Sequence, residues 1–342
     1  MTPVFARHQA LAAGAERELA MDPHGAEVLY RKAADAHPDE VLPRLYLSKT
    51  LSDKVFFRSL SKEEARALGE AACAISAQVV ADHPAEPKAR MMHAANMGRL
   101  AMVSGNRQKA RLVGRVRAET EEALRLLAGD TALAELAEVE ARIGMASASD
   151  TASSLASTST GQGDGSTATA ARLWRRVAGK ARQAVRHTKL SLSRGRRATD
   201  GPAFASEGEW LFEFEDIVHH SLGVWHREMA QLHPVVRYAV RVLYGAKLDK
   251  GSFETALYHF RRAHEIKPRL VHSVECAKAH VAMGNRELAI EEVTRGLALP
   301  LEDVSSWHIY QDGLRLKAAL EEGRMPTYGG HPDPEPRPPS SA

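Results

Sequence analysis

Histidine and cysteine are the residues of this chain that could hold a metal ion or carry out acid–base chemistry. The sequence has 16 histidines and 2 cysteines, and His219, His226 and His233 recur every seven residues. Two helical turns separate such side chains by about 10 Å, whereas two ligands on one helix need a spacing of three or four residues. Cys73 and Cys276 form no C-x-x-C pair, and H-E-x-x-H is absent. We therefore expect no metal ligands and no cofactor, and we interpret the histidines as residues of the core or its flanks.

The motifs of common catalytic and nucleotide-binding sites are also missing. The sequence contains no G-x-S-x-G, no Walker loop and no dinucleotide fingerprint. Gly161, Gly163 and Gly165 follow no predicted strand, so a linker explains them better than a phosphate-binding loop. The sequence predicts a protein that is not an enzyme.

A concentration of positive charge predicts a partner instead. Residues 172–197 contain ten Lys or Arg and no Asp or Glu, although the chain has a net charge of only +3. On a helical projection of residues 172–186, the apolar and basic side chains occupy separate arcs, which is typical of an amphipathic helix. An acidic protein surface or an anionic membrane could fold it; a solvated charge run is the other interpretation. The predicted contact residues are Arg172, Trp174, Arg175, Arg176, Lys180, Arg182 and Arg186.

Composition restricts the class of protein. With 342 residues, 44% hydrophobic and 26% charged, the chain has the composition of a soluble globular protein. Its longest uncharged apolar stretch, residues 71–81, is shorter than the roughly 20 residues that span a bilayer, so we expect no transmembrane segment. The cytoplasm is the expected location. A mitochondrial presequence is the alternative, because the first acidic residue is Glu16.

The hydrophobic pattern predicts helices throughout. Apolar residues between positions 211 and 232 recur every three or four residues, as on one face of a helix. No sustained alternation of β-branched residues is present, so no sheet is expected. The stripe consists of Leu211, Phe214, Val218, Leu222, Trp225, Met229 and Leu232.

A repeated pattern then predicts how these helices pair. It has the form G-x4-A-x3-F-x2-A-x4-P in one copy and recurs about 33 residues later, as in tetratricopeptide-like helical hairpins. In such hairpins, small residues let two helices approach closely, so we expect no room for a larger side chain at Ala263. We expect Gly251 to lie at the turn, where a side chain would strain the backbone. The copies are Gly251, Ala256, Phe260, Ala263, Pro268 and Gly284, Ala289, Val293, Gly296, Pro300.

The same residues resemble a known family, the regulator of microtubule dynamics proteins. Its H-x-L-G-x-W motif stands here as His220, Leu222, Gly223 and Trp225, and its A-L-x-x-F-x-x-A-x-E-x-x-P motif begins at Ala256. The resemblance implies a tetratricopeptide-like domain that associates with microtubules or organelle surfaces and has no enzymatic activity. This chain departs from the family in one respect: some sixty residues separate the upstream helices from the helix that carries His220, where the family has a short turn. The family-motif residues are His220, Leu222, Gly223, Trp225, Ala256, Phe260, Ala263, Pro268, Gly284, Ala289 and Pro300.

We thus predict an all-α fold of antiparallel hairpins stacked as an α-solenoid, in two helical blocks that pack on each other. The N-terminal block is 4–145, and the tetratricopeptide-like C-terminal block is 206–322. Between them lies a Ser/Thr/Gly-rich linker, 146–205, with the basic segment inside it. A disordered Pro-rich tail, 323–342, follows.

Two functions from different classes fit this organisation. The first is a non-enzymatic scaffold, in the cytoplasm on microtubules or the spindle, whose basic segment contacts tubulin. The alternative is a lipid-binding or organelle-contact module that touches anionic membranes. A polar groove would favour the first, and a continuous apolar cavity beneath Trp225, Met229 and Leu243 the second. Nucleic acid is a weaker interpretation, because the basic segment has no interleaved aromatic residue besides Trp174.

Overall fold

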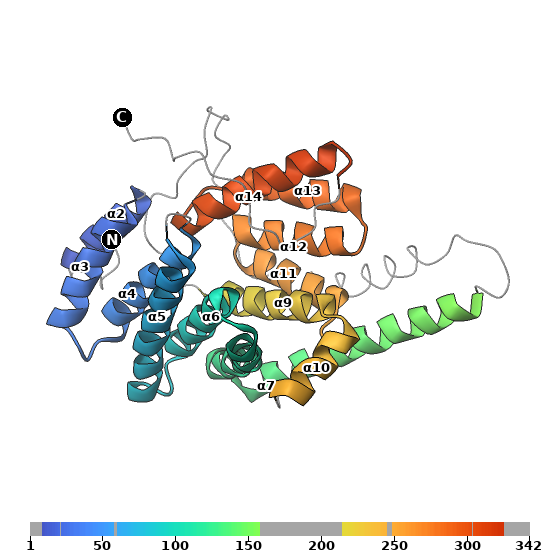
Figure 1. Ribbon diagram of the computed structural model, residues 1–342, viewed down its shortest axis with the longest axis horizontal. Coiled ribbons are helices and arrows are strands. Elements are labelled where there is room, and N and C mark those ends of the chain that lie inside the picture. Colours follow the sequence, from blue (N-terminus) through green and yellow to red (C-terminus); the bar gives the residue numbers. More distant parts are fainter. Residues whose placement is uncertain are drawn as a thin grey trace, which may run out of the picture. The chain divides into compact units, whose positions relative to one another are not determined.

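All regular elements of the described residues are helices, which confirms the all-α prediction. The structure is a computed structural model, and it describes residues 9–20, 22–57, 60–157, 214–244, 248–302 and 304–324. The ranges 1–137 and 202–342 make up one compact unit and 138–201 a second. Within the first unit, most consecutive helices pack on each other as antiparallel hairpins, whereas the helix Glu215–Gln231 packs mainly on the helix Phe253–Ile266 (Figure 1). Their identity as tetratricopeptide-like repeats stays a prediction.

Several of the N-terminal helices begin at side chains that accept hydrogen bonds from free backbone N–H groups. Asp22 accepts a hydrogen bond from the Gly25 N–H at 2.8 Å, directly before Pro23 at the first helical position. Ser61 and Glu64 form a reciprocal capping box. The helices are α2 (Gln9–Leu19), α3 (Pro23–Ala36), α4 (Val41–Asp53), the 3-10 turn η1 (Lys54–Phe56), α5 (Lys62–Asp82), α6 (Pro87–Val103) and α7 (Asn106–Ser157).

α7 consists of two helices joined at Gly129, whose φ of 84° interrupts the helical backbone. Its backbone is helical to Ser157, into the stretch that we expected to be linker. The rest of that linker, the basic segment 172–197 and the tail from residue 325 lie outside the described residues. The predicted boundaries between blocks therefore stay predictions.

The C-terminal helices carry the family motifs. They are α9 (Glu215–Gln231), α10 (Pro234–Tyr244), α11 (Phe253–Ile266), α12 (Leu270–Ala282), α13 (Arg286–Leu297) and α14 (Val304–Glu321). We predicted a helix over 211–232; the described helix begins at Glu215 and ends one residue before Leu232. Phe214 lies at its N-cap, and residues 211–213 lie outside the described part of the chain.

The turn between α12 and α13 is made by Gly284, whose φ of 78° favours glycine. The Gly284 N–H donates to the Val281 carbonyl at 3.0 Å, and the Asn285 N–H donates to the His280 carbonyl at 2.9 Å. These bonds satisfy carbonyls at the end of α12 and reverse the chain so that α13 packs on α12.

Two pairs of helices share a contact between a glycine and an aromatic ring. A Cβ atom on Gly14 of α2 would lie 2.4 Å from the Tyr30 ring of α3, and one on Gly223 of α9 would lie 2.6 Å from the Phe260 ring of α11. Both rings are at most 1% exposed. The glycines thus provide the space into which each ring packs, and they set the distance between the paired helices.

The two ends of the first unit share a hydrophobic core. Phe214, Val218 and Leu222 of the C-terminal part are buried against residues of α6 and α7. This contact agrees with the expectation that the C-terminal block packs on the N-terminal block. The residues that they meet are Met91, Ala94, Ala123, Leu124 and Leu136.

Candidate functional site

The motif helix α9 is packed against α11 along the family-motif residues. Ala256 and Ala263 of α11 are fully buried, and Leu222 of α9 is fully buried. Gly251 precedes α11, and a Cβ atom there would lie 2.2 Å from the carbonyl oxygen of His226. The sequence argument attributed the need for glycine at this position to backbone strain; the close approach to α9 is the reason that the structure gives.

Trp225 connects this helix to the N-terminal part of the unit. Its indole Nε1 donates to the Val113 carbonyl at 3.2 Å, and the Arg117 guanidinium lies over its ring, 4.6 Å from the ring centre. The side chain is 6% exposed. Trp225 thus occupies the core, as its position in the stripe indicates, and adds a polar and a cation–π contact to it.

A buried polar cluster lies where α9 meets α12; we use this name for Asp216, His220, Arg269 and His272. Arg269 donates from Nε to Asp216 Oδ2 at 2.5 Å, and His272 Nε2 lies 3.0 Å from the same oxygen. His272 Nδ1 lies 3.1 Å from His220 Nδ1. Asp216 and His272 are fully buried. The chain of contacts joins the start of the motif helix to the start of α12.

The electrostatics of this polar cluster indicate a structural role. Burial would raise the pKa of Asp216, but the hydrogen bond from His272 and the charge of Arg269 outweigh it and hold this pKa below its usual value. Burial and the neighbouring His272 lower the pKa of His220 to about 3. The cluster therefore holds a carboxylate and a guanidinium beside neutral imidazoles at pH 7. Both ring nitrogens of His272 contact other members of the cluster, so they interact within the cluster.

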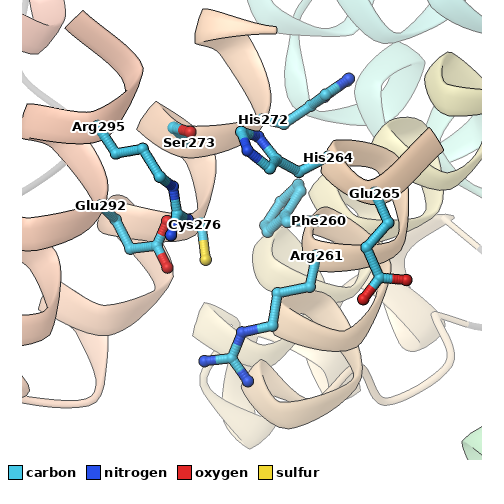
Figure 2. A pocket seen from close by; sticks show the side chains of 9 residues that line it. All are labelled: Phe260, Arg261, His264, Glu265, His272, Ser273, Cys276, Glu292 and Arg295. Carbon is cyan, nitrogen blue, oxygen red and sulfur yellow. The ribbon is translucent and has the colours of Figure 1, made fainter. Parts of the chain in front are cut away.

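A cavity of about 220 Å³ opens between α11, α12 and α13 beside the cluster (Figure 2). Figure 2 shows charged side chains from α11 and α13 around a floor that includes the Phe260 ring. Its volume is below the roughly 300–1,000 Å³ of most small-molecule pockets. The cavity is therefore suited to an ion or one polar side chain of a partner. Its lining is Phe260, Arg261, His264, Glu265, His272, Ser273, Cys276, Glu292 and Arg295.

Cys276 in this lining is not set up as a nucleophile. Burial, with the nearby Glu292, raises the pKa of the thiol to about 12. Thiolate, which is the reactive form, is therefore a negligible fraction at pH 7.

α10 exposes an apolar face to solvent. Five large side chains of this helix are between 45% and 70% exposed, and none of its residues is buried. The opposite side carries Arg237, which donates to the Leu232 carbonyl at 2.7 Å, and exposed Arg241. Such a face is unusual on a protein surface and indicates an interaction site. We define the apolar face of α10 as Val235, Val236, Tyr238, Val242 and Leu243.

The predicted site residues divide into two groups. The basic residues from Arg172 to Arg186, with Trp174, lie outside the described residues. The family-motif residues lie on α9 and α11–α13 or at their ends: Pro268 follows α11, Ala289 lies fully buried in α13, and Pro300 follows α13. Leu243, which would line an apolar cavity with Trp225 and Met229 under the lipid alternative, is 69% exposed and does not join them.

Sequence reasoning missed the polar cluster and the apolar face of α10. Asp216 and His220 lie four residues apart on one helix, which was a usable signal. The partners of Asp216 are Arg269 and His272, which lie 53 and 56 residues later in the chain, and no sequence pattern indicated that they would meet it. For α10, Pro234 directly after the stripe was the available sign of a new helix.

Comparison with known protein families finds a match in the C-terminal part of the chain. Residues 211–312 match the family model described as regulator of microtubule dynamics protein 1-3. This match confirms the resemblance carried by His220, Gly223 and Trp225, over less than a third of the 342 residues. No curated protein matches the chain. In the described ranges, every helix is too short or too polar to cross a bilayer.

Proposed function

Taking the match of residues 211–312 to the regulator of microtubule dynamics family as the premise, we propose that this protein is a non-enzymatic scaffold that binds microtubules. It acts in the cytoplasm, on microtubules or the spindle, through protein–protein contacts. The match is the observation that carries the proposal.

Two surfaces support a protein partner. The basic segment 172–197 has the charge that acidic tubulin tails would attract. The apolar face of α10 supplies the exposed hydrophobic area that the centre of a protein interface requires. Electrostatic attraction would speed encounter, and burial of α10 would slow dissociation.

The alternative is a lipid-binding or organelle-contact module. An amphipathic helix with exposed valines on one side and Arg237 and Arg241 on the other also suits a membrane interface. The cavity beside the polar cluster argues against an enclosed acyl chain, because its lining carries four charged side chains, Arg261, Glu265, Glu292 and Arg295. The scaffold therefore remains the first proposal.

Co-sedimentation of the purified full-length chain with polymerised tubulin tests the proposal. We expect binding that weakens as salt rises and that falls at least tenfold in affinity with Arg175→Glu/Arg176→Glu or with Val235→Asp/Val242→Asp. The matched control is Val28→Asp, because Val28 of α3 is 69% exposed and lies outside both surfaces.

Flotation with anionic vesicles distinguishes the two functions. Binding to vesicles and not to microtubules would select the lipid alternative. Binding to neither would overturn both. In cells, a tagged chain lacking residues 147–205 should lose its place on microtubules and become diffuse.

A further inference from the structure

Three buried side chains of the kinds that bind zinc converge beside the cavity. Cys276 and His280 lie four residues apart on α12, so both project from the same face of that helix. Glu292 reaches them from α13. One ligand atom from each residue lies within 4.8 Å of the other two. The exposed fractions are 2% for Cys276, 2% for His280 and 8% for Glu292.

His280 is the member that a purely structural account leaves unexplained. Both of its ring nitrogens are buried, and neither has a hydrogen-bond partner. Burying such groups without partners is unfavourable. Burial and the nearby Arg261 lower the pKa of His280 to about 4, so the ring is neutral at pH 7 and offers a lone pair. A neutral imidazole is the form that binds a metal.

The other two residues already interact in a way that a metal would replace. The Cys276 thiol is hydrogen-bonded to Glu292, which helps to raise the pKa of the thiol. Arg295 also donates to Glu292 and would hold the carboxylate in place, as second-layer partners of metal ligands do. Arg261 and Arg295 oppose a cation here, but the thiolate that forms on binding offsets one of the added charges.

We propose that Cys276, His280 and Glu292 form a zinc site. A thiolate, an imidazole and a carboxylate are ligands that zinc accepts, and a soft sulfur ligand disfavours calcium and magnesium. In a tetrahedral site the ligand atoms lie about 3.5 Å apart, so a small movement of α13 toward α12 would complete it. Binding breaks the S–H bond, forms a Zn–S bond and releases one proton to solvent. Cys276 and Glu292 line the cavity, which leaves space for a water as fourth ligand.

Cobalt substitution tests the site in the full-length chain. The protein is stripped with a chelator and titrated with CoCl2, because tetrahedral cobalt–thiolate bonding gives a charge-transfer absorption that zinc then displaces. We expect one equivalent of cobalt with this absorption, and a higher melting temperature when zinc is added.

Cys276→Ser should abolish the absorption, whereas Cys73→Ser should retain it, because Cys73 lies on α5 outside the cluster. His280→Gln, which keeps the thiol, should weaken cobalt binding at least tenfold. His264→Gln, a cavity residue outside the triad, should not. Absence of the absorption in the unmodified chain would overturn the proposal even if a variant failed to fold, and so would an equal signal after Cys276→Ser.

Discussion

The indole Nε1 of Trp225 donates a hydrogen bond to the backbone carbonyl of Val113, 112 residues earlier in the chain, across 3.2 Å. This contact joins two distant parts of the sequence within the first unit. Together with the hydrophobic cluster around Leu222, it ties the motif helix to the N-terminal helices. The two blocks should therefore unfold together.

Trp225→Phe is the first test of this coupling. Phenylalanine cannot make this hydrogen bond and has a smaller ring system, so we expect the free energy of unfolding to fall by about 2 kcal/mol. Urea unfolding followed by circular dichroism measures this. Trp307→Phe is the control, because Trp307 is 9% exposed within the cluster around α12–α14 and should leave the coupling intact. Two separate unfolding transitions in the unmodified chain would contradict the idea.

Gly223→Ala tests the contact between α9 and α11. The new methyl group would lie 2.6 Å from the Phe260 ring, which is 1% exposed. We expect destabilisation of about 1–3 kcal/mol, although alanine is the better helix former. Gly114→Ala in α7, where nothing lies within 4 Å, should instead stabilise the protein. Phe260→Leu combined with Gly223→Ala should recover part of the loss if the clash is the cause.

Ala263→Leu tests the repeat pattern at its second helix. Ala263 is fully buried and Arg262 is partly exposed at the next position of α11. A leucine at 263 has no room and should lower the free energy of unfolding by about 1–3 kcal/mol, whereas Arg262→Leu should be nearly neutral. Denaturant melts give the ranking, and the reverse order would remove the assignment of these positions.

Replacing residues 158–205 tests whether the insert contributes to folding. These residues follow the described end of α7 at Ser157. Because the free energy of loop closure changes by only about 0.6 kcal/mol per doubling of length, a Gly/Ser linker long enough to span the join should leave the melting temperature nearly unchanged. A large drop in scanning calorimetry would mean that the insert packs on the helices.

The pattern of small and aromatic residues predicted which positions are packed, but not every partner. The sequence predicted that Ala256, Phe260 and Ala263 are packed, because helical packing needs small residues where helices approach and a large residue to fill the groove. The contact between Phe260 of α11 and Gly223 of α9 was not predicted. α10 lies between these two helices in the sequence, so the contact depends on how the helices are ordered in space. The same holds for Asp216 and Arg269. Each helix presents several polar side chains, and the choice among them is made by tertiary packing.

Stability should decrease as the pH falls from 7 to 5. Burial and the neighbouring His259 lower the pKa of His219 to about 3, and burial and the neighbouring His272 lower that of His220 to about 3. In the unfolded chain a histidine titrates near 6.5. Between these values the unfolded state binds more protons than the folded state, so acid favours unfolding by up to about 1.4 kcal/mol per pH unit for each histidine. Above pH 7 both states are neutral and this contribution vanishes. The low pKa of Glu275, about 2, acts only below about pH 4.5. Urea melts at pH 7.5, 6 and 5 measure the slope, and His219→Gln should reduce it by about one proton. A slope that is flat from pH 7 to 5 would mean that these rings bind protons as readily in the folded protein as in the unfolded chain.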